Sequence, residues 1–204
     1  MIRRRTALSV SACALLLATP LLTACGSDAH PGAAAVVDGE RITVAQLQGH
    51  VRVVRDAQRE SPQARQLVAA SGRLNQDVLA RLIKYQVIER AARDSGVGVT
   101  RREVQQARRS IETREGGADV VRALYLQQGV APEQIDQEVR MLVTRDKLDR
   151  KLGDEGANAL FVRTSKALDI DVNPRYGSWD DAQGMAVQAG DPWLRPAETD
   201  RQPA

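Results

Sequence analysis

The sequence of 204 residues predicts a mainly α protein: a bundle of about five to six helices with a small N-terminal β-hairpin that can pair with a short C-terminal strand. Only six residues are aromatic, fewer than a β-sandwich or a β-barrel usually carries. Hydrophobic residues make up 43% of the chain and charged residues 27%, which is normal for a globular domain and argues against wholesale disorder. A helical core of alanine, valine and leucine is therefore favoured.

The first 25 residues have the layout of a bacterial export signal. Arg3–Arg5 form a charged start, and the apolar run Ala7–Leu22 is shorter than the roughly 20 residues that span a bilayer. The last four residues, Leu22–Cys25, resemble the bacterial lipobox. This resemblance implies cleavage between Ala24 and Cys25 and a diacylglyceryl group on Cys25, with N-acylation by a fatty acid such as palmitate left open. An ordinary signal peptide with an incidental cysteine is the alternative.

The leader changes how charge and cysteine content are interpreted. It holds three of the 29 basic residues and none of the 26 acidic ones, so the mature chain is formally neutral. A neutral chain without a dense basic stripe argues against a nucleic-acid partner. Cys25 is the only thiol that remains after Cys13 is removed, which excludes a disulfide or a cysteine-based zinc site. We expect a signal peptide (1–24), a lipidated tether (25–33) and an anchor on the extracytoplasmic face of the cell membrane.

The N-terminal elements follow from local signals. Residues 34–37 and 40–42 are predicted to form two short strands joined at Asp38-Gly39, a pair that supplies the positive φ angles of a tight turn. Thr43 and Gln46 form a capping box that opens a helix, and Ser61-Pro62 ends it.

Three further helices and a short one are predicted in the middle of the chain. The helix over residues 74–95 has apolar residues around more than half of its circumference, which predicts the central position in the bundle. Thr100 caps a helix that runs to Glu115, and a short helix covers residues 120–128. The helix over residues 132–152 changes its apolar face halfway, so we expect its halves to pack on different partners.

The C-terminal part is shorter and more polar. Residues 154–168 can form one more helix, and residues 169–172 alternate like a strand with a polar face. Residues 180–204 are polar and contain proline and glycine, so a mobile tail is predicted there, with Trp193-Leu194 as a docking point.

Three segments in a fixed order resemble one known family. They are AAVVDGERITVAQL (34–47), VLARLIKYQVIERAARDSGVGVTRREV (78–104) and LYLQQGVAPEQIDQEVRMLVTRDKL (124–148). Together they are similar to the SurA N-terminal-domain family, which includes extracytoplasmic chaperone and foldase lipoproteins of the SurA and PrsA type. The resemblance covers roughly residues 34–152.

The resemblance implies both a fold and a function. Residues 159–177 look like the returning C-terminal segment of the family, so the strand 169–172 would pair with the hairpin 36–42, giving one chaperone domain over residues 34–179. The chain passes from Leu152 to this segment without room for a parvulin domain of about 90–100 residues. The implied activity is client binding without prolyl isomerisation.

Direct signs of other chemistry are weak. The sequence contains no GxSxG, Walker, HExxH or CxxC motif. A calcium loop starting at Asp169 would need glycine at its sixth position, where Pro174 stands. Neither His30 nor His50 has a cluster of cysteine or acidic residues near it in the sequence, so both are expected to be surface residues rather than metal ligands. Tyr176 and Trp179 are candidate peptide-binding residues; the alternative is that they form a lid over a small core.

Three functional hypotheses remain. The first is a membrane-anchored, ATP-independent holdase for unfolded or partly folded exported polypeptides, with no cofactor. The second is a non-catalytic adaptor or scaffold lipoprotein that binds one dedicated envelope partner. The third is an enzyme, which we do not expect because the sequence shows neither a nucleophile–base pair nor a metal-ligand set.

Overall fold

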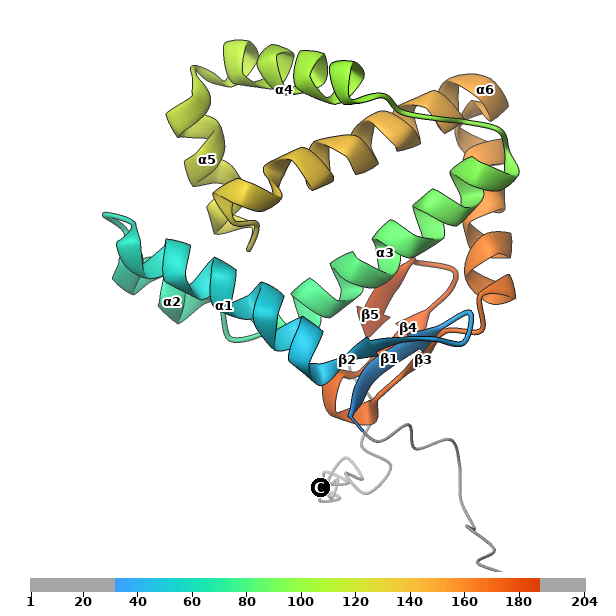
Figure 1. The fold of residues 1–204 in the computed structure, drawn as a ribbon, viewed down its shortest axis with the longest axis horizontal. Helices are drawn as coiled ribbons and strands as arrows, with labels where there is room; N and C mark the ends of the chain where they lie inside the picture. Colours follow the sequence, from blue (N-terminus) through green and yellow to red (C-terminus); the bar gives the residue numbers. More distant parts are fainter. Residues whose placement is uncertain (1–31, 188–204) are drawn as a thin grey trace, which may run out of the picture.

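A computed structural model describes residues 32–187 of the chain (Figure 1). The predicted signal peptide (1–24), the cleavage site between Ala24 and Cys25, the lipid on Cys25 and the Trp193-Leu194 docking point lie outside the described residues. Only the end of the predicted tether falls within them.

The N-terminal hairpin and a C-terminal strand form one small sheet at one end of the molecule (Figure 1). Strands β1 (Ala33–Val37) and β2 (Glu40–Thr43) pair antiparallel, and β3 (Asp171–Val172) pairs antiparallel with the other edge of β1, giving the order β2-β1-β3. The turn places Asp38 at φ 53° and Gly39 at φ 76°, which are the positive φ angles that the Asp-Gly pair predicts. The predicted pairing of the return strand with the hairpin is confirmed, although the strand is shorter than residues 169–172.

Six α-helices make up most of the rest of the described chain. Their bounds are α1 Val44–Glu60, α2 Ala64–Ala70, α3 Leu74–Asp94, α4 Arg101–Glu115, α5 Ala118–Gln127 and α6 Ile135–Ala167. The 3-10 turn η1 (Pro132–Gln134) precedes α6. The predicted capping boxes are both present, since Thr43 accepts a hydrogen bond from the Gln46 N–H and Thr100 accepts one from the Glu103 N–H.

Helix α3 is the centre of the domain, as its wide apolar stripe predicts. It packs against the sheet, against α1 and along α6, and Leu79 and Ile83 on it are almost completely buried. The main core lies where α1, α3 and the sheet meet. One smaller cluster lies between the C-terminal end of α3 and the two halves of α6, and another lies between α4 and the first half of α6. A helix buried on several sides holds these parts in one body.

Helix α6 contains a sharp break at Gly153. The backbone there has φ 72° and ψ 160°, a region that is essentially restricted to glycine. The first half of α6 packs against α3 and α4, and the second half returns the chain to the sheet (Figure 1). The sequence predicts two helices separated at this residue, and the break is confirmed; the start differs, because residues 132–134 are a 3-10 turn.

Two elements correct the prediction. The short helix α2 lies between Ser61-Pro62 and α3, where no helix was expected. Strands β4 (Ser178–Asp180) and β5 (Met185–Val187) form a second hairpin, which overlaps the start of the segment 180–204 that was predicted to be a mobile tail. The carboxylate of Asp180 accepts the Ala182 and Gln183 N–H groups, 2.8 and 3.0 Å away, which stabilises the turn. Within residues 32–187, no helix is long and apolar enough to cross a membrane.

Candidate functional site

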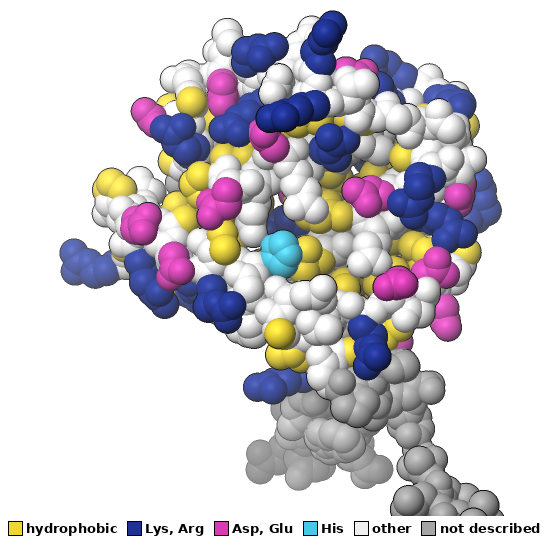
Figure 2. All heavy atoms as spheres, viewed as in Figure 1, with side chains coloured by type: hydrophobic (Ala, Val, Ile, Leu, Met, Phe, Trp, Pro, Cys, Tyr) yellow, Lys and Arg dark blue, Asp and Glu magenta, His cyan; other side chains and the backbone are white. Residues whose placement is uncertain are grey.

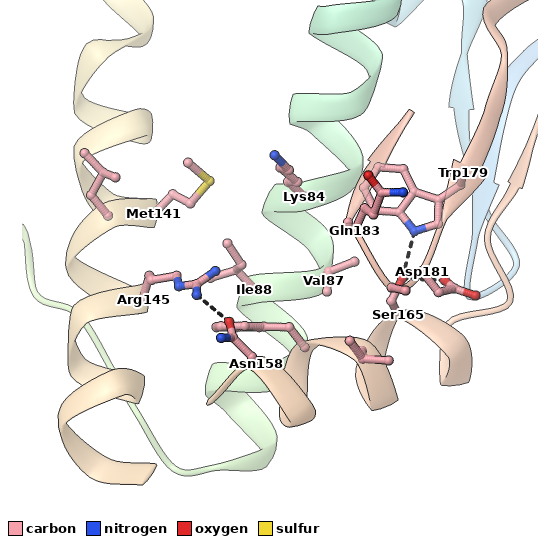
Figure 3. Close-up of a pocket in the computed structure, with 15 residues that line it drawn as sticks. Lys84, Val87, Ile88, Met141, Arg145, Asn158, Ser165, Trp179, Asp181 and Gln183 are labelled. Carbon is pink, nitrogen blue, oxygen red and sulfur yellow. Dashed lines mark hydrogen bonds between the residues drawn. The ribbon is translucent and has the colours of Figure 1, made fainter. Parts of the chain in front are cut away.

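An apolar hollow of about 600 Å³ lies between α3, both halves of α6 and the β4–β5 hairpin (Figure 3). We call it the apolar hollow. Its apolar lining residues come from four separate segments: Val87 and Ile88, Met141 and Leu142, Phe161 and Val162, and Trp179. Because the break at Gly153 brings the two halves of α6 to neighbouring sides of the hollow, residues distant in sequence form one apolar surface.

Leu142 is the clearest sign that this surface lacks a partner within the described chain. Its side chain is 46% exposed although it lies on the wall of the hollow. The sequence places Leu142 on one face with Ile135 and Val139, but the structure buries those two residues under α4 and leaves Leu142 open to solvent. Exposed large apolar side chains around a concavity are typical of binding surfaces.

A chain of hydrogen bonds holds Trp179 in place. The Trp179 indole N–H donates to the Ser165 hydroxyl at 2.8 Å, and that hydroxyl donates to the Asp181 carboxylate at 2.6 Å (Figure 3). Ser165 is only 2% exposed. Since both polar groups of the pair are satisfied, the half-buried indole ring can serve as a fixed apolar wall.

The two aromatic residues singled out from the sequence occupy different environments. Tyr176 is 6% exposed and belongs to the main core beneath the hairpin, which is the position of a lid residue. Trp179 lines the apolar hollow. The structure therefore brings only Trp179 to a surface that a ligand can reach.

Arg145 links the two halves of α6 across the break at Gly153. Its guanidinium donates to the Asn158 side-chain oxygen at 2.6 Å and lies 4.7 Å from the centre of the Phe161 ring (Figure 3). These contacts join the halves on either side of Gly153. The cation also stacks on the one phenylalanine of the chain, so Phe161 is held against the floor of the hollow.

A polar cluster fixes α3 against the first half of α6. The Tyr85 hydroxyl donates to the Glu138 carboxylate at 2.6 Å, and Arg81 lies 3.4 Å from the same carboxylate. Arg81 also donates to the carbonyls of Gln128 and Gly129, at the end of α5. Burial of the Tyr85 phenol and its hydrogen bond to Glu138 raise its pKa above the ordinary value. The helices that carry the apolar hollow are thereby held in a fixed relation.

The opposite side of α3 bears a more polar concavity of about 500 Å³. Arg90 pairs with Asp38 at 2.8 Å across it, and His50 lies at its edge, 3.3 Å from the Gln134 amide. Figure 2 shows a face of the molecule on which basic and acidic side chains are mixed rather than gathered by sign. In the part of the chain that the structure describes, no group of three or more metal-ligand side chains comes together.

Comparison with known proteins identifies the family. The family described as SurA-like N-terminal domain matches residues 1–149. The chain belongs to this family. No curated protein and no solved structure matches the chain. The matched part ends within the first half of α6, so Phe161, Trp179 and the other residues on the C-terminal side of the apolar hollow lie beyond it.

Sequence reasoning found only part of this site. Trp179 was a candidate because an aromatic side chain can anchor an unfolded client. Leu142 and Phe161 were missed, since periodicity identifies an apolar face but not the partner that covers it. The change of apolar face within residues 132–152 was the only signal that the helix has more than one packing surface.

Proposed function

We propose that this protein is a membrane-anchored extracytoplasmic lipoprotein that binds unfolded or partly folded exported polypeptides as an ATP-independent holdase. The observation that carries the proposal is the apolar hollow with Leu142 left exposed on its wall, in a chain of the SurA-like N-terminal domain family. An unfolded chain displays apolar side chains that are buried in its native state. A concave apolar surface can cover such side chains and delay their aggregation.

The size and composition of the hollow support a polypeptide client. About 600 Å³ accommodates a few apolar side chains, and the hollow is open on one side, so a chain could pass over it. Its walls come from rigid helices and a hydrogen-bonded tryptophan, so little ordering entropy is lost when a client binds.

The proposal does not include prolyl isomerisation. From Gly153 the chain continues as the second half of α6 to Ala167 and reaches β3 at Asp171. An inserted catalytic domain of about 90–100 residues has no place in this short connection.

Suppression of aggregation tests the holdase activity. A protein of residues 26–204, which keeps the whole described domain without the lipid, is mixed at near-stoichiometric ratio with several chemically unfolded clients, and light scattering is followed. We expect slower aggregation without added nucleotide. A parallel refolding assay limited by proline isomerisation should show no acceleration. Normal aggregation of every client would contradict the holdase and favour an adaptor for one folded partner.

Membrane anchoring is tested separately on the full-length chain. A variant in which residues 1–25 are replaced by an ordinary cleavable export signal cannot carry a thioether-linked lipid and loses its apolar leader, so it should move from the membrane fraction to the soluble fraction, while the unaltered chain stays with the membrane. Mass spectrometry of the N-terminal peptide should find the acylated cysteine. An unmodified Cys25 on a soluble mature chain would refute the anchor.

A further inference from the structure

A second hollow continues the apolar one along α3. It has a volume of about 550 Å³ and shares Lys84 and Met141 with the apolar hollow. Figure 3 shows these two side chains on facing helices at the end of the apolar hollow. We call the two hollows together the α3 groove, with an apolar end at Ile88 and a polar end at Gln76.

The length of the α3 groove corresponds to a short extended peptide. Residues 76 and 88 are twelve positions apart on one helix, which is about 18 Å at 1.5 Å per residue. An extended chain covers about 3.3–3.6 Å per residue, so about five client residues span the groove. Such a segment can reach both ends at once.

The charged side chains of the polar end largely satisfy one another. Arg81 is paired with Glu138 and with two carbonyl groups. Arg73 donates to the Gln76 amide at 3.0 Å. Asp77 lies four positions from each of these arginines, the spacing at which side chains on a helix are neighbours, and seven positions from Lys84.

Lys84, at the junction of the two ends, is different. Its side chain is exposed, and among residues 32–187 it has no hydrogen-bond or ion-pair partner. Glu138 and Asp181 also line the groove, but neither is paired with Lys84: Glu138 lies 3.4 Å from Arg81 and accepts the Tyr85 hydroxyl, and Asp181 accepts the Ser165 hydroxyl. The cation of Arg145 is also occupied, by Asn158 and the Phe161 ring. An ammonium group without an ion-pair partner among the described residues thus stands beside an apolar surface.

We propose that the α3 groove prefers client segments of about five residues in which an apolar side chain is next to an acidic one. The apolar side chain occupies the apolar hollow against Leu142 and Trp179, and the carboxylate pairs with Lys84. This preference rests on the proposed holdase function and adds the chemistry of the client to it. Segments with lysine or arginine in place of the acidic residue are disfavoured, because they bring a like charge to Lys84.

Three synthetic peptides test the preference. They have the sequence Gly-Ser-Leu-Phe-Leu-X-X-Gly-Ser with X as glutamate, glutamine or lysine, and each carries an N-terminal fluorescein for anisotropy titration at low salt. We expect the glutamate peptide to bind about two- to fivefold more tightly than the glutamine peptide, as for an exposed ion pair, and the lysine peptide to bind most weakly. The difference should shrink at high salt.

Two charge-reversal variants assign the effect to the groove. Lys84→Glu should reverse the order of the three peptides. Lys166→Glu makes the same change at an exposed lysine that lines neither hollow, and it should leave the order unchanged. Equal effects of the two substitutions would mean that only net charge matters and would overturn the proposal.

The outcomes separate this inference from the proposed function. Equal affinity for all three peptides, with weaker binding when their Leu-Phe-Leu is replaced by serines, would overturn the acidic preference and leave the holdase intact. Failure of all peptides to bind, together with unsuppressed aggregation, would overturn both.

Discussion

Leu142 offers the sharpest test of the apolar hollow, because its side chain lines the hollow and is largely exposed. Its replacement should therefore weaken client binding more than it weakens folding. Complete burial of a leucine side chain is worth about 1.5–3 kcal/mol, and the 46% that is exposed corresponds to about 0.7–1.4 kcal/mol when a client covers it. The Leu142→Ser variant should therefore bind the Leu-Phe-Leu glutamate peptide about three- to tenfold more weakly.

The chain supplies a matched control on the same helix. Leu152 is 42% exposed but does not line the apolar hollow, so Leu152→Ser removes a similar apolar group from a different surface. Anisotropy titration measures the peptide affinity of both variants, and thermal unfolding followed by circular dichroism verifies that both remain folded. Equal affinities for the two variants, or a larger loss for Leu152→Ser, would refute the assignment of the hollow as the binding surface.

Three further predictions concern what holds the groove in shape. Gly153→Ala should lower the free energy of unfolding, measured in urea, by about 1–3 kcal/mol. No neighbour crowds the added Cβ, so the cost comes from the backbone conformation. Gly98→Ala is the control, because Gly98 has no positive φ and its replacement should not have this effect. Tyr85→Phe should cost about 1–3 kcal/mol at neutral pH by removing the hydrogen bond to Glu138. The raised pKa of Tyr85 means that the phenol loses its proton at a lower pH in the unfolded chain than in the folded one. The free energy of unfolding should therefore be constant with respect to this group below pH 10.0 and decline above it, and Tyr85→Phe should show a smaller decline. A hydrogen bond from Lys147 on α6, followed in size by one from the Thr100 N–H, lowers the pKa of Glu103 to about 2. The contribution of the Glu103 carboxylate to folding stability is therefore present above about pH 4.5 and is lost as the pH falls toward 2. The free energy of unfolding should fall less steeply with decreasing pH for Glu103→Gln than for the unaltered chain. Identical curves for the two proteins would contradict this role of Glu103.

The parts of the fold that the sequence predicts well depend on local chemistry. Thr43 and Thr100 can cap a helix whatever packs around them, because the hydrogen bonds are formed within four residues. The turn at Asp38-Gly39 and the break at Gly153 are likewise set by the conformations these residues tolerate. The pairing of β3 with β1 is a contact between distant segments, and it was available only through the family resemblance.

The missed elements depend on packing between distant segments. Strands β4 and β5 have three residues each, too few for alternation to show, and the hairpin is held by the contact of Trp179 with Ser165 on α6. Helix α2 lacks a side-chain cap at Gln63, and Ser61-Pro62 before it was interpreted only as the end of the preceding helix. The apolar hollow was missed for the same reason: Leu142, Phe161 and Trp179 meet only after α6 has turned at Gly153.

Site-specific photo-crosslinking tests the central claim most directly. A benzophenone amino acid replaces Leu142 in one protein of residues 26–204 and Leu152 in another, and each is irradiated with a chemically unfolded client during aggregation suppression. If the apolar hollow holds the client, position 142 should yield a crosslinked product that disappears once the client has folded, and position 152 should yield little. Equal crosslinking from both positions, or crosslinking from position 152 alone, would contradict the account.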